Sequence, residues 1–190
     1  MFQIVRLRDV VRIPPDRIGK PLKEVATEIL RTRYESTLSY DYGYIIRVFD
    51  VKVDPVGKLV HGDGGTYHKA EFSMLTFYPK VGEVIEGEVV EITDFGAFVK
   101  IGPADALLHI SQILDDYLSI DMKQGMIIGS NTQRVLKVGS KVRVKITAVS
   151  LGRGASLGKI GVTCRQPFLG ALEWIEEDLK KIKEAKEAKK

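Results

Sequence analysis

The sequence predicts an α+β protein made of two parts, a β-α-β-β domain followed by an all-β five-stranded barrel with a C-terminal helix. Up to Pro79, stretches with apolar residues at every second position enclose one stretch with helical spacing. After Pro79, short valine- and isoleucine-rich stretches separated by glycines follow one another. This change of pattern places a domain boundary between residues 1–79 and residues 80–190.

The first part begins with a strand over residues 2–13, in which apolar residues and arginines are interleaved until Pro14 and Pro15 stop the ladder. Residues 20–36 carry apolar side chains on one face of a helix, at Leu22, Val25, Ile29 and Leu30. Strand patterns return over two further stretches that follow the helix, residues 44–53 and 66–78. A helix packed on an antiparallel sheet accommodates this order.

The second part contains five expected strands, at residues 81–92, 96–101, 106–113, 141–150 and 159–165. Their shortness and the glycines between them are typical of a small barrel. We expect the connection at residues 114–139 to be partly helical. A glycine-rich insertion occupies residues 151–158. A helix is expected over residues 168–190, because apolar residues recur on one face at Leu172, Ile175, Leu179 and Ile182.

Composition excludes several classes of protein. No run of 18 apolar residues exists, and the alternating start does not resemble a secretory signal. The single cysteine, Cys164, excludes an intramolecular disulfide and a cysteine-rich zinc site. The three histidines, His61, His68 and His109, have no metal-ligand spacing. We therefore expect a cytoplasmic protein without a metal or another cofactor.

The net charge of +4 is modest, but the charges are unevenly distributed. Residues 80–121 contain two basic and nine acidic residues, whereas residues 122–172 contain nine basic residues and no acidic one. Such a basic segment suits a phosphate backbone, although it also fits a solvated face balanced by the acidic strands. Alternation places Lys141, Arg143 and Lys145 on one face of a strand, as RNA contacts or as ordinary exposed charge.

Two phenylalanines and one histidine form the sharpest candidate site. Phe95 and Phe98 flank a Gly-Ala pair at the turn between two strands, and His109 lies on the next strand. The small residues between the rings let both rings reach the surface, where they offer nucleobases a stacking platform. The alternative is that the rings fill the core, as aromatic residues on strands usually do.

Four spaced elements occur in order within residues 80–165: Gly82-Glu83-Val84 with Gly87-Glu88-Val89, Phe95 to Val99, Leu108 to Ser111, and Val138-Gly139 with Val142. Together they resemble the RNA-binding OB-fold repeat named after ribosomal protein S1. The resemblance implies that Phe95, Phe98 and His109 form the RNA face. The expected RNA contacts also include the basic residues Lys141, Arg143, Lys145 and Lys159.

The sequence departs from that family along one edge. Ala106 stands where a glycine is usual, Ser150 where an aspartate commonly ends the fourth strand, and Lys159 where an arginine opens the fifth. The insertion at residues 151–158 lies at the same place. We therefore expect weak or sequence-independent binding of single-stranded RNA.

Segments outside the barrel narrow the family further: Val11 to Pro15, Gly62 to Gly65, Phe77 to Pro79, and Arg165 to Gly170. With the barrel they resemble, nearly end to end, the E-prime subunit of archaeal RNA polymerase, a relative of the seventh subunit of eukaryotic polymerase II. The resemblance implies a truncated RNP-like domain at residues 1–79 that docks on the polymerase core. It also implies a stalk formed as a heterodimer with the helical F subunit of the polymerase, near the RNA exit path. The implied role is RNA guidance and promoter opening, without catalysis.

The glycine-rich run Gly62, Asp63, Gly64 and Gly65 belongs to this docking domain. It lacks the lysine and the helix start of a phosphate-binding loop, so it is either a tight turn or a surface docking loop. The polymerase resemblance favours docking. Two other functions stay open: a translation initiation factor, whose barrel usually leads the chain, and an RNA-processing accessory protein, which need not carry these N-terminal elements.

Overall fold

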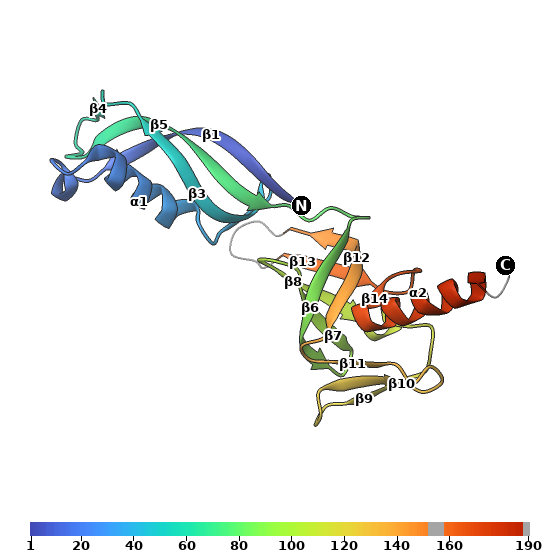
Figure 1. Ribbon diagram of the computed structural model, residues 1–190. Helices are drawn as coiled ribbons and strands as arrows, with labels where there is room; N and C mark the ends of the chain where they lie inside the picture. The colour runs from blue at the N-terminus through green and yellow to red at the C-terminus, as the bar shows by residue number, and fades with distance from the viewer. Residues whose placement is uncertain (152–157, 188–190) are drawn as a thin grey trace. The chain divides into compact units, whose positions relative to one another are not determined.

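The computed structural model describes residues 1–151 and 158–187. The chain forms two compact units, Met1–Tyr78 and Pro79–Ser150 continued from Gly158 (Figure 1). Residues 152–157 of the expected glycine-rich insertion lie outside the described residues. No helix in the described part of the chain is long and apolar enough to cross a membrane.

The first unit is built on an antiparallel sheet whose main strands were expected from the alternation. The strand order is β1-β5-β3-β2, and β4 pairs with β5. The bounds are β1 (Phe2–Ile13), β2 (Leu38–Ser39), β3 (Gly43–Val53), β4 (Lys58–Leu59) and β5 (Thr66–Phe77). The register of β1 against β5 runs without a break from Phe2 opposite Phe77 to Ile13 opposite Thr66.

Helix α1 (Leu22–Tyr34) lies along one face of this sheet (Figure 1). Its buried residues Val25, Ala26 and Leu30 pack in one core with Val11 and Phe72 of the sheet. Each fully buried side chain of valine or leucine size contributes about 1.5–3 kcal/mol relative to exposure. The helix therefore fixes which face of β1 is buried, and the even-numbered residues of β1 are exposed.

The second unit contains the expected five-stranded barrel, formed by β6 (Val84–Thr93), β7 (Gly96–Lys100), β8 (Asp105–His109), β12 (Lys141–Ser150) and β13 (Lys159–Thr163). The strands follow the order β13-β8-β7-β6-β12, and pairing of β12 with β13 closes the barrel. β8 and β13 are parallel. Val142, Val144 and Ile146 of β12 are fully buried inside, as their alternation requires.

The connection at residues 114–139 contains a small antiparallel sheet and no helix, so the expectation of partial helix was wrong. Its strands are β9 (Leu118–Asp121), β10 (Met126–Gly129) and β11 (Val135–Lys137). Ile127 pairs with Ile120 on one side and Leu136 on the other, and both Ile127 and Leu136 are buried. Branched side chains favour this pleated arrangement over a helix, and Gly125, with φ of 60°, turns β9 into β10.

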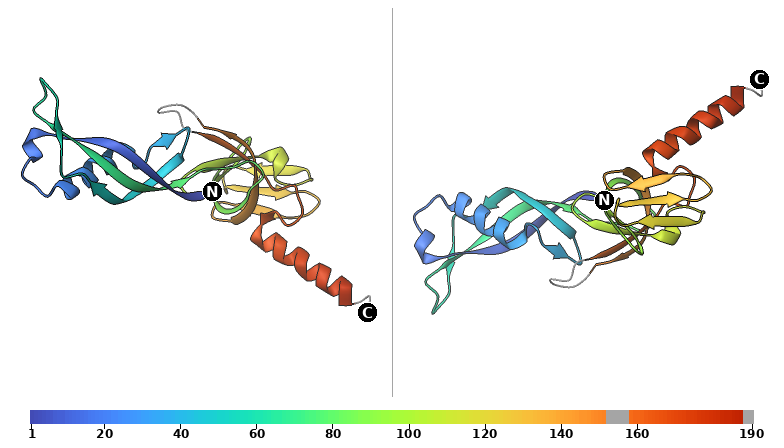
Figure 2. Two further views of the ribbon diagram at one scale, coloured as in Figure 1. Left: turned by 90° about the horizontal axis from the view of Figure 1, so that it is seen from above. Right: turned by 90° about the horizontal axis from the view of Figure 1, so that it is seen from below.

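The C-terminal helix α2 (Leu172–Glu187) follows β14 (Gly170–Ala171), which pairs with β12. Trp174 and Ile175 are buried, whereas Leu179 and Ile182 are about 40% exposed. Figure 2 shows the helix projecting from the barrel. The expected apolar face is therefore buried only at the start of the helix. Arg134 fixes this start, because it pairs with Asp178 and lies 5.6 Å from the Trp174 ring centre.

Candidate nucleic-acid interface

Phe95, Phe98 and His109 come together on the outer surface of the barrel. On β7 the neighbours Ala97 and Val99 are buried, so alternation turns Phe98 outward. The centres of the Phe95 and Phe98 rings are 6.1 Å apart and the ring planes are nearly perpendicular, at 88°. Phe95 is 44% exposed and His109 is also exposed. The rings therefore do not fill the core, and each leaves surface for a planar ligand.

Gly96 brings the turn that carries Phe95 against β8. It pairs with His109, and a Cβ atom at this position would lie 2.2 Å from the carbonyl oxygen of Leu108. The carbonyl of Phe95 also accepts a hydrogen bond of 2.9 Å from the Ile110 amide. The small residue between the rings is thus required by a close approach of two backbones.

Ser111 orients the imidazole of His109. The Ser111 amide donates to His109 Nδ1 over 3.2 Å, and its Oγ lies 2.8 Å from the same nitrogen. Because Nδ1 accepts from the amide, a neutral ring carries its proton on Nε2, which can donate to an oxygen of a ligand. Ser111 was not among the residues expected to contact RNA, although the Leu-His-x-Ser element contains it.

A lane of apolar and small residues extends from Phe98 around the barrel. Phe98 pairs with Leu107 on β8, Leu107 with Gly161 on β13, and Gly161 with Ala148 on β12. Leu107, Gly161 and Ala148 are each half-buried or exposed. A Cβ atom at Gly161 would make only ordinary contacts of 3.5 Å or more. Sequence reasoning missed this lane, because its members become neighbours only when the barrel closes.

The three basic residues of β12 point outward as the alternation predicts, but neighbouring side chains bind two of them, Arg143 and Lys145. Arg143 donates to Glu86 Oε1 over 2.8 and 3.1 Å, and Lys145 donates to Gln166 over 3.1 Å. Lys141 lies opposite Glu88 in the β12–β6 register. These contacts favour the alternative of a solvated face balanced by an acidic strand.

The basic strand and the rings do not form one continuous cluster. Strand β6, with its glutamates, lies between β12 and β7 in the sheet. Lys159 is exposed at the start of β13, opposite Ser150. The structure therefore brings together Phe95, Phe98 and His109, and leaves the four basic candidates on other parts of the barrel surface.

The loop at residues 62–65 is held by its aspartate. Asp63 accepts from Arg12 over 2.7 and 2.5 Å, from the Tyr67 hydroxyl over 2.6 Å and from the Gly65 amide over 3.0 Å. The hydrogen bonds from Arg12, Tyr67 and Gly65 hold the pKa of Asp63 well below its usual range. Gly62, with φ of 85°, is the only glycine of the run in the left-handed region. The tight-turn interpretation therefore applies to Gly62.

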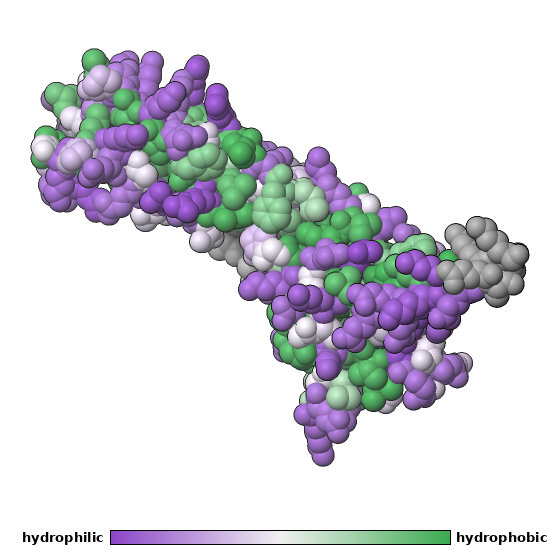
Figure 3. All heavy atoms as spheres, in the orientation of Figure 1, coloured by the Kyte–Doolittle hydropathy of each residue, from purple (hydrophilic) through white to green (hydrophobic). Residues whose placement is uncertain are grey.

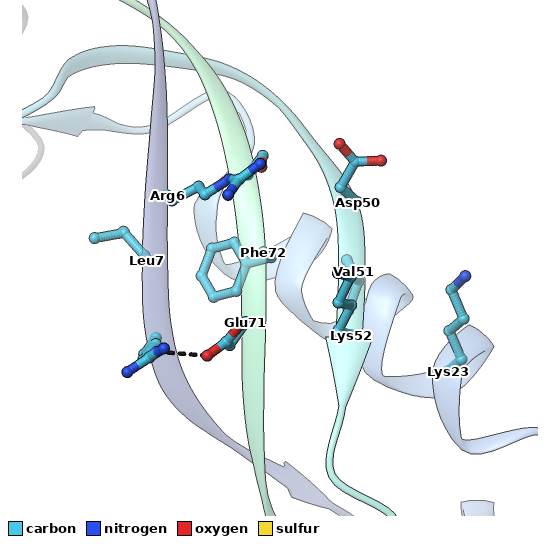
Figure 4. A pocket seen from close by; sticks show the side chains of 10 residues that line it. Arg6, Leu7, Lys23, Asp50, Val51, Lys52, Glu71 and Phe72 are labelled. Carbon is cyan, nitrogen blue, oxygen red and sulfur yellow. Dashed lines mark ion pairs between the residues drawn. The ribbon is translucent and has the colours of Figure 1, made fainter.

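A pocket of about 760 Å³ lies in the first unit and shares no residue with the ring cluster (Figure 4). Arg6 and Arg8 of β1 line it, and Arg8 forms an ion pair of 2.5 Å with Glu71. Among the described residues, no group of three or more His, Cys, Asp and Glu side chains could hold a metal ion.

Comparison with known proteins covers both units. Residues 8–64 match the SHS2 domain found in the N terminus of Rpb7p/Rpc25p/MJ0397, and residues 78–160 match the S1 RNA binding domain. DNA-directed RNA polymerase subunit Rpo7 of Saccharolobus shibatae is 44% identical over 93% of this chain and 98% of its own length. The Rpo7 subunit of Saccharolobus solfataricus is 44% identical over 95% of this chain and all of its own length.

A more distant relative is RNA polymerase III subunit rpc8 of Schizosaccharomyces pombe, 29% identical over 61% of this chain and 57% of its own length. The near end-to-end matches confirm the resemblance expected from the sequence and do not favour a translation factor or an RNA-processing protein. The chain belongs to the family of DNA-directed RNA polymerase subunit Rpo7.

Proposed function

We propose that this chain is the non-catalytic stalk subunit of an archaeal-type RNA polymerase, and that it binds nascent single-stranded RNA and assists promoter opening. Residues 80–190 supply the RNA-binding barrel. Residues 1–79 dock on the polymerase core, with the loop at residues 62–65 as a contact, and the helical F subunit completes the stalk. Such a complex works in the cytoplasm, and this chain requires no cofactor.

One observation carries the RNA assignment: two phenylalanine rings and an oriented histidine stand on the outside of a closed barrel whose interior is filled by aliphatic side chains. An exposed ring does not gain the free energy that its burial would provide, so a cluster of exposed rings indicates a binding surface. Stacking on such rings is tolerant of base sequence. The half-buried lane through Leu107 and Gly161 offers further contact for an extended strand.

Titration of a labelled single-stranded oligonucleotide tests this assignment. Stacking is worth about 1–3 kcal/mol per base, so Phe98→Ala and Phe95→Ala should each weaken binding about 5- to 150-fold. Tyr117→Ala is the matched control, because Tyr117 is an aromatic residue of the same unit, 82% exposed and outside the ring cluster. Folded Phe95 and Phe98 variants that bind like the parent would contradict the stacking proposal.

The proposed partners are tested separately. Purification of the tagged chain from its host should recover the polymerase core and the F subunit together. A saturating concentration of the F subunit should also raise the melting temperature of the isolated chain, because a partner that binds only the folded form stabilises it. An unchanged melting curve under these conditions would count against the heterodimer, and recovery of ribosomal subunits or an exonuclease would replace the polymerase assignment.

A further inference from the structure

The outer edge of β1 carries unpaired backbone groups whose positions follow from the register. Met1 and Tyr78 form a hydrogen-bonded pair, since the amide of Tyr78 donates to the Met1 carbonyl over 2.9 Å and the Met1 amino group bonds to the Tyr78 carbonyl. Hydrogen-bonded and non-hydrogen-bonded pairs alternate in an antiparallel ladder. Odd-numbered residues of β1 therefore bond to β5, and even-numbered residues turn their N–H and C=O groups to the open edge.

A side chain closes this edge at one point and leaves the rest open. The amide of Val10 takes Asp9 Oδ1 as its acceptor over 2.7 Å, as an outward N–H should, and Asp9 is itself held by Arg33 and Tyr34 of α1. Among the described residues, no such bond involves the backbone of Ile4, Arg6 or Arg8. The open edge thus runs from Phe2 to Arg8, about 20 Å of extended chain.

This edge lacks three of the devices that usually protect a sheet from pairing with another chain. Natural edges are often kept short, bulged or interrupted by proline, and β1 is none of these, so its charged side chains are the protection that remains. The other end of the sheet follows that rule, because β2 has only two residues. β1 has twelve residues, and its register shows neither a bulge nor a proline. A long, regular edge of this kind is a template for pairing with another strand.

The exposed side chains define what kind of strand would fit. Phe2 and Ile4 are 55% and 66% exposed, and Arg6 and Arg8 follow on the same face. Arg8 is paired with Glu71, whereas no carboxylate among the described residues pairs with Arg6. In the view of Figure 3, hydrophilic side chains project beside hydrophobic ones along the margin where β1 runs. Directly opposite residues interact across strands, so apolar residues suit Phe2 and Ile4, and acidic residues suit the arginines.

We propose that the β1 edge from Phe2 to Arg8 is a docking site for an extended segment of a partner protein, which adds a strand to the sheet and presents apolar residues to Phe2 and Ile4 and carboxylates to Arg6 and Arg8. Backbone bonds to the even-numbered residues hold the strand, and the side chains select its sequence. A second copy of this chain fits less well, because an antiparallel pairing of the two edges would place Phe2 opposite Arg8 and Ile4 opposite Arg6, so the arginines would meet no carboxylate. The identity of the partner as a polymerase component rests on the proposed function.

A tethered strand tests the chemistry of the site in the full chain. An N-terminal extension of about nine residues is joined through a Gly/Ser linker of about six residues, which keeps the strand at high local concentration. In this extension threonines occupy every second position. Two glutamates stand between them in the N-terminal half, and two valines stand between them in the half next to the linker. The amides of Ile4 and Arg6 should exchange with solvent about tenfold more slowly, while the amides of Val5 and Leu7, already bonded to β5, stay unchanged. An extension with lysines in place of the glutamates should give no such protection.

Two outcomes of this experiment overturn the proposal. Unchanged exchange at Ile4 and Arg6 with the glutamate strand shows that the edge accepts no strand, and equal protection by the lysine strand shows that the arginines select nothing. Ile4→Pro removes one outward donor without touching the ladder to β5, so it should fold and lose the protection at Arg6. Ile4→Thr keeps the backbone donor at this position and should retain the protection at Arg6. An unfolded Ile4→Pro variant would show that the Ile4 amide is needed inside the sheet, which contradicts the derived alternation.

Hydrogen exchange of the assembled polymerase tests the occupant. If the chain incorporates into the polymerase and its even-numbered β1 amides are protected there, the proposal is supported. Incorporation without this protection overturns the proposal, and so does a dimer of this chain paired through β1. A failure to incorporate contradicts the proposed function instead, while the tethered strand still decides whether the edge is a docking site.

Discussion

The loop at residues 62–65 of the first unit and the ring cluster of the second unit were both candidate sites, and the structure treats them differently. In the loop, Asp63 joins β1 and β5 of the same unit through hydrogen bonds from Arg12 and Tyr67, and it also accepts from the Gly65 amide within the loop. In the ring cluster, Phe95 and His109 are exposed and the internal bonds of His109 leave Nε2 available. The Asp63 carboxylate is bound by groups of its own unit, whereas the ring cluster keeps exposed rings and one imidazole nitrogen available for a ligand.

This difference shows that residue type alone is a poor guide to a binding surface. Arg143 is a second example, since a basic residue on an RNA-binding barrel is held by Glu86 of the next strand. What distinguishes a candidate contact is the surface or the donor that remains after the protein's own interactions are counted.

The largest effect is expected where the ring cluster depends on backbone contact. Gly96→Ala would place a Cβ atom 2.2 Å from the Leu108 carbonyl oxygen, and φ at this residue is 154°. Overpacking and strain together should destabilise the second unit by about 3 kcal/mol. Thermal unfolding followed by the fluorescence of Trp174, the only tryptophan, reports on this unit.

The matched control is Gly161→Ala in the adjacent lane, where the new methyl group meets nothing closer than 3.5 Å and φ is not positive. It should melt within a few degrees of the parent. Equal destabilisation by both substitutions would mean that the turn is not specifically dependent on Gly96.

Gly64→Val tests the docking assignment of the loop. Gly64 has no positive φ, and a Cβ atom there meets only Pro15 Cγ, at 3.2 Å, so the variant should fold. If the loop contacts the polymerase core, the added bulk should weaken incorporation about tenfold and leave oligonucleotide binding intact. Gly64→Ala should assemble nearly normally. Normal assembly of the valine variant, measured by co-purification with the core, would reduce the loop to a turn.

The two units also contain comparable aspartates that hold loops. Asp116 accepts from the Thr132 amide and hydroxyl, each over 2.8 Å, and from the Asn131 amide. Hydrogen bonds from Thr132 lower the pKa of Asp116 to about 2, and bonds from Arg12 lower the pKa of Asp63. A carboxyl group with a depressed folded-state pKa contributes stability above its unfolded pKa of about 3.9, and this contribution is lost as the pH falls.

Asp116→Asn should therefore flatten the decline, between about pH 4 and pH 2, in the melting temperature that Trp174 fluorescence reports. The stabilisation that the Asp116 carboxylate provides belongs to the second unit, where Trp174 lies. Asp63→Asn, which alters only the first unit, should leave that fluorescence transition unchanged and lower the stability seen by exchange of β1 amides. An identical acid profile for parent and Asp116→Asn would show that this carboxylate does not couple folding to pH.

The extent to which the sequence predicted these features depends on how local each one is. The strands, α1 and the outward rings follow from alternation, helical spacing and a motif within residues 95–111. The β9–β11 sheet was missed because a short run of apolar residues has no decisive period, and pairing with Ile127 determines its form. The Arg143–Glu86 contact joins residues 57 positions apart, and only the barrel register brings them together.

The smallest expected effect concerns that same contact. Glu86→Gln should release Arg143 for phosphate contact, raise affinity for single-stranded RNA about two- to fivefold and steepen the salt dependence by up to about 0.7 in the log–log slope. Glu91→Gln is the control, because it removes a like charge from the same strand opposite Phe98 without freeing Arg143. If the RNA affinity of both variants rises equally, the increase comes from the change in net charge. If Glu86→Gln alone steepens the salt slope, Arg143 is an RNA contact that its neighbour restrains, and the basic strand and the rings share the work of binding.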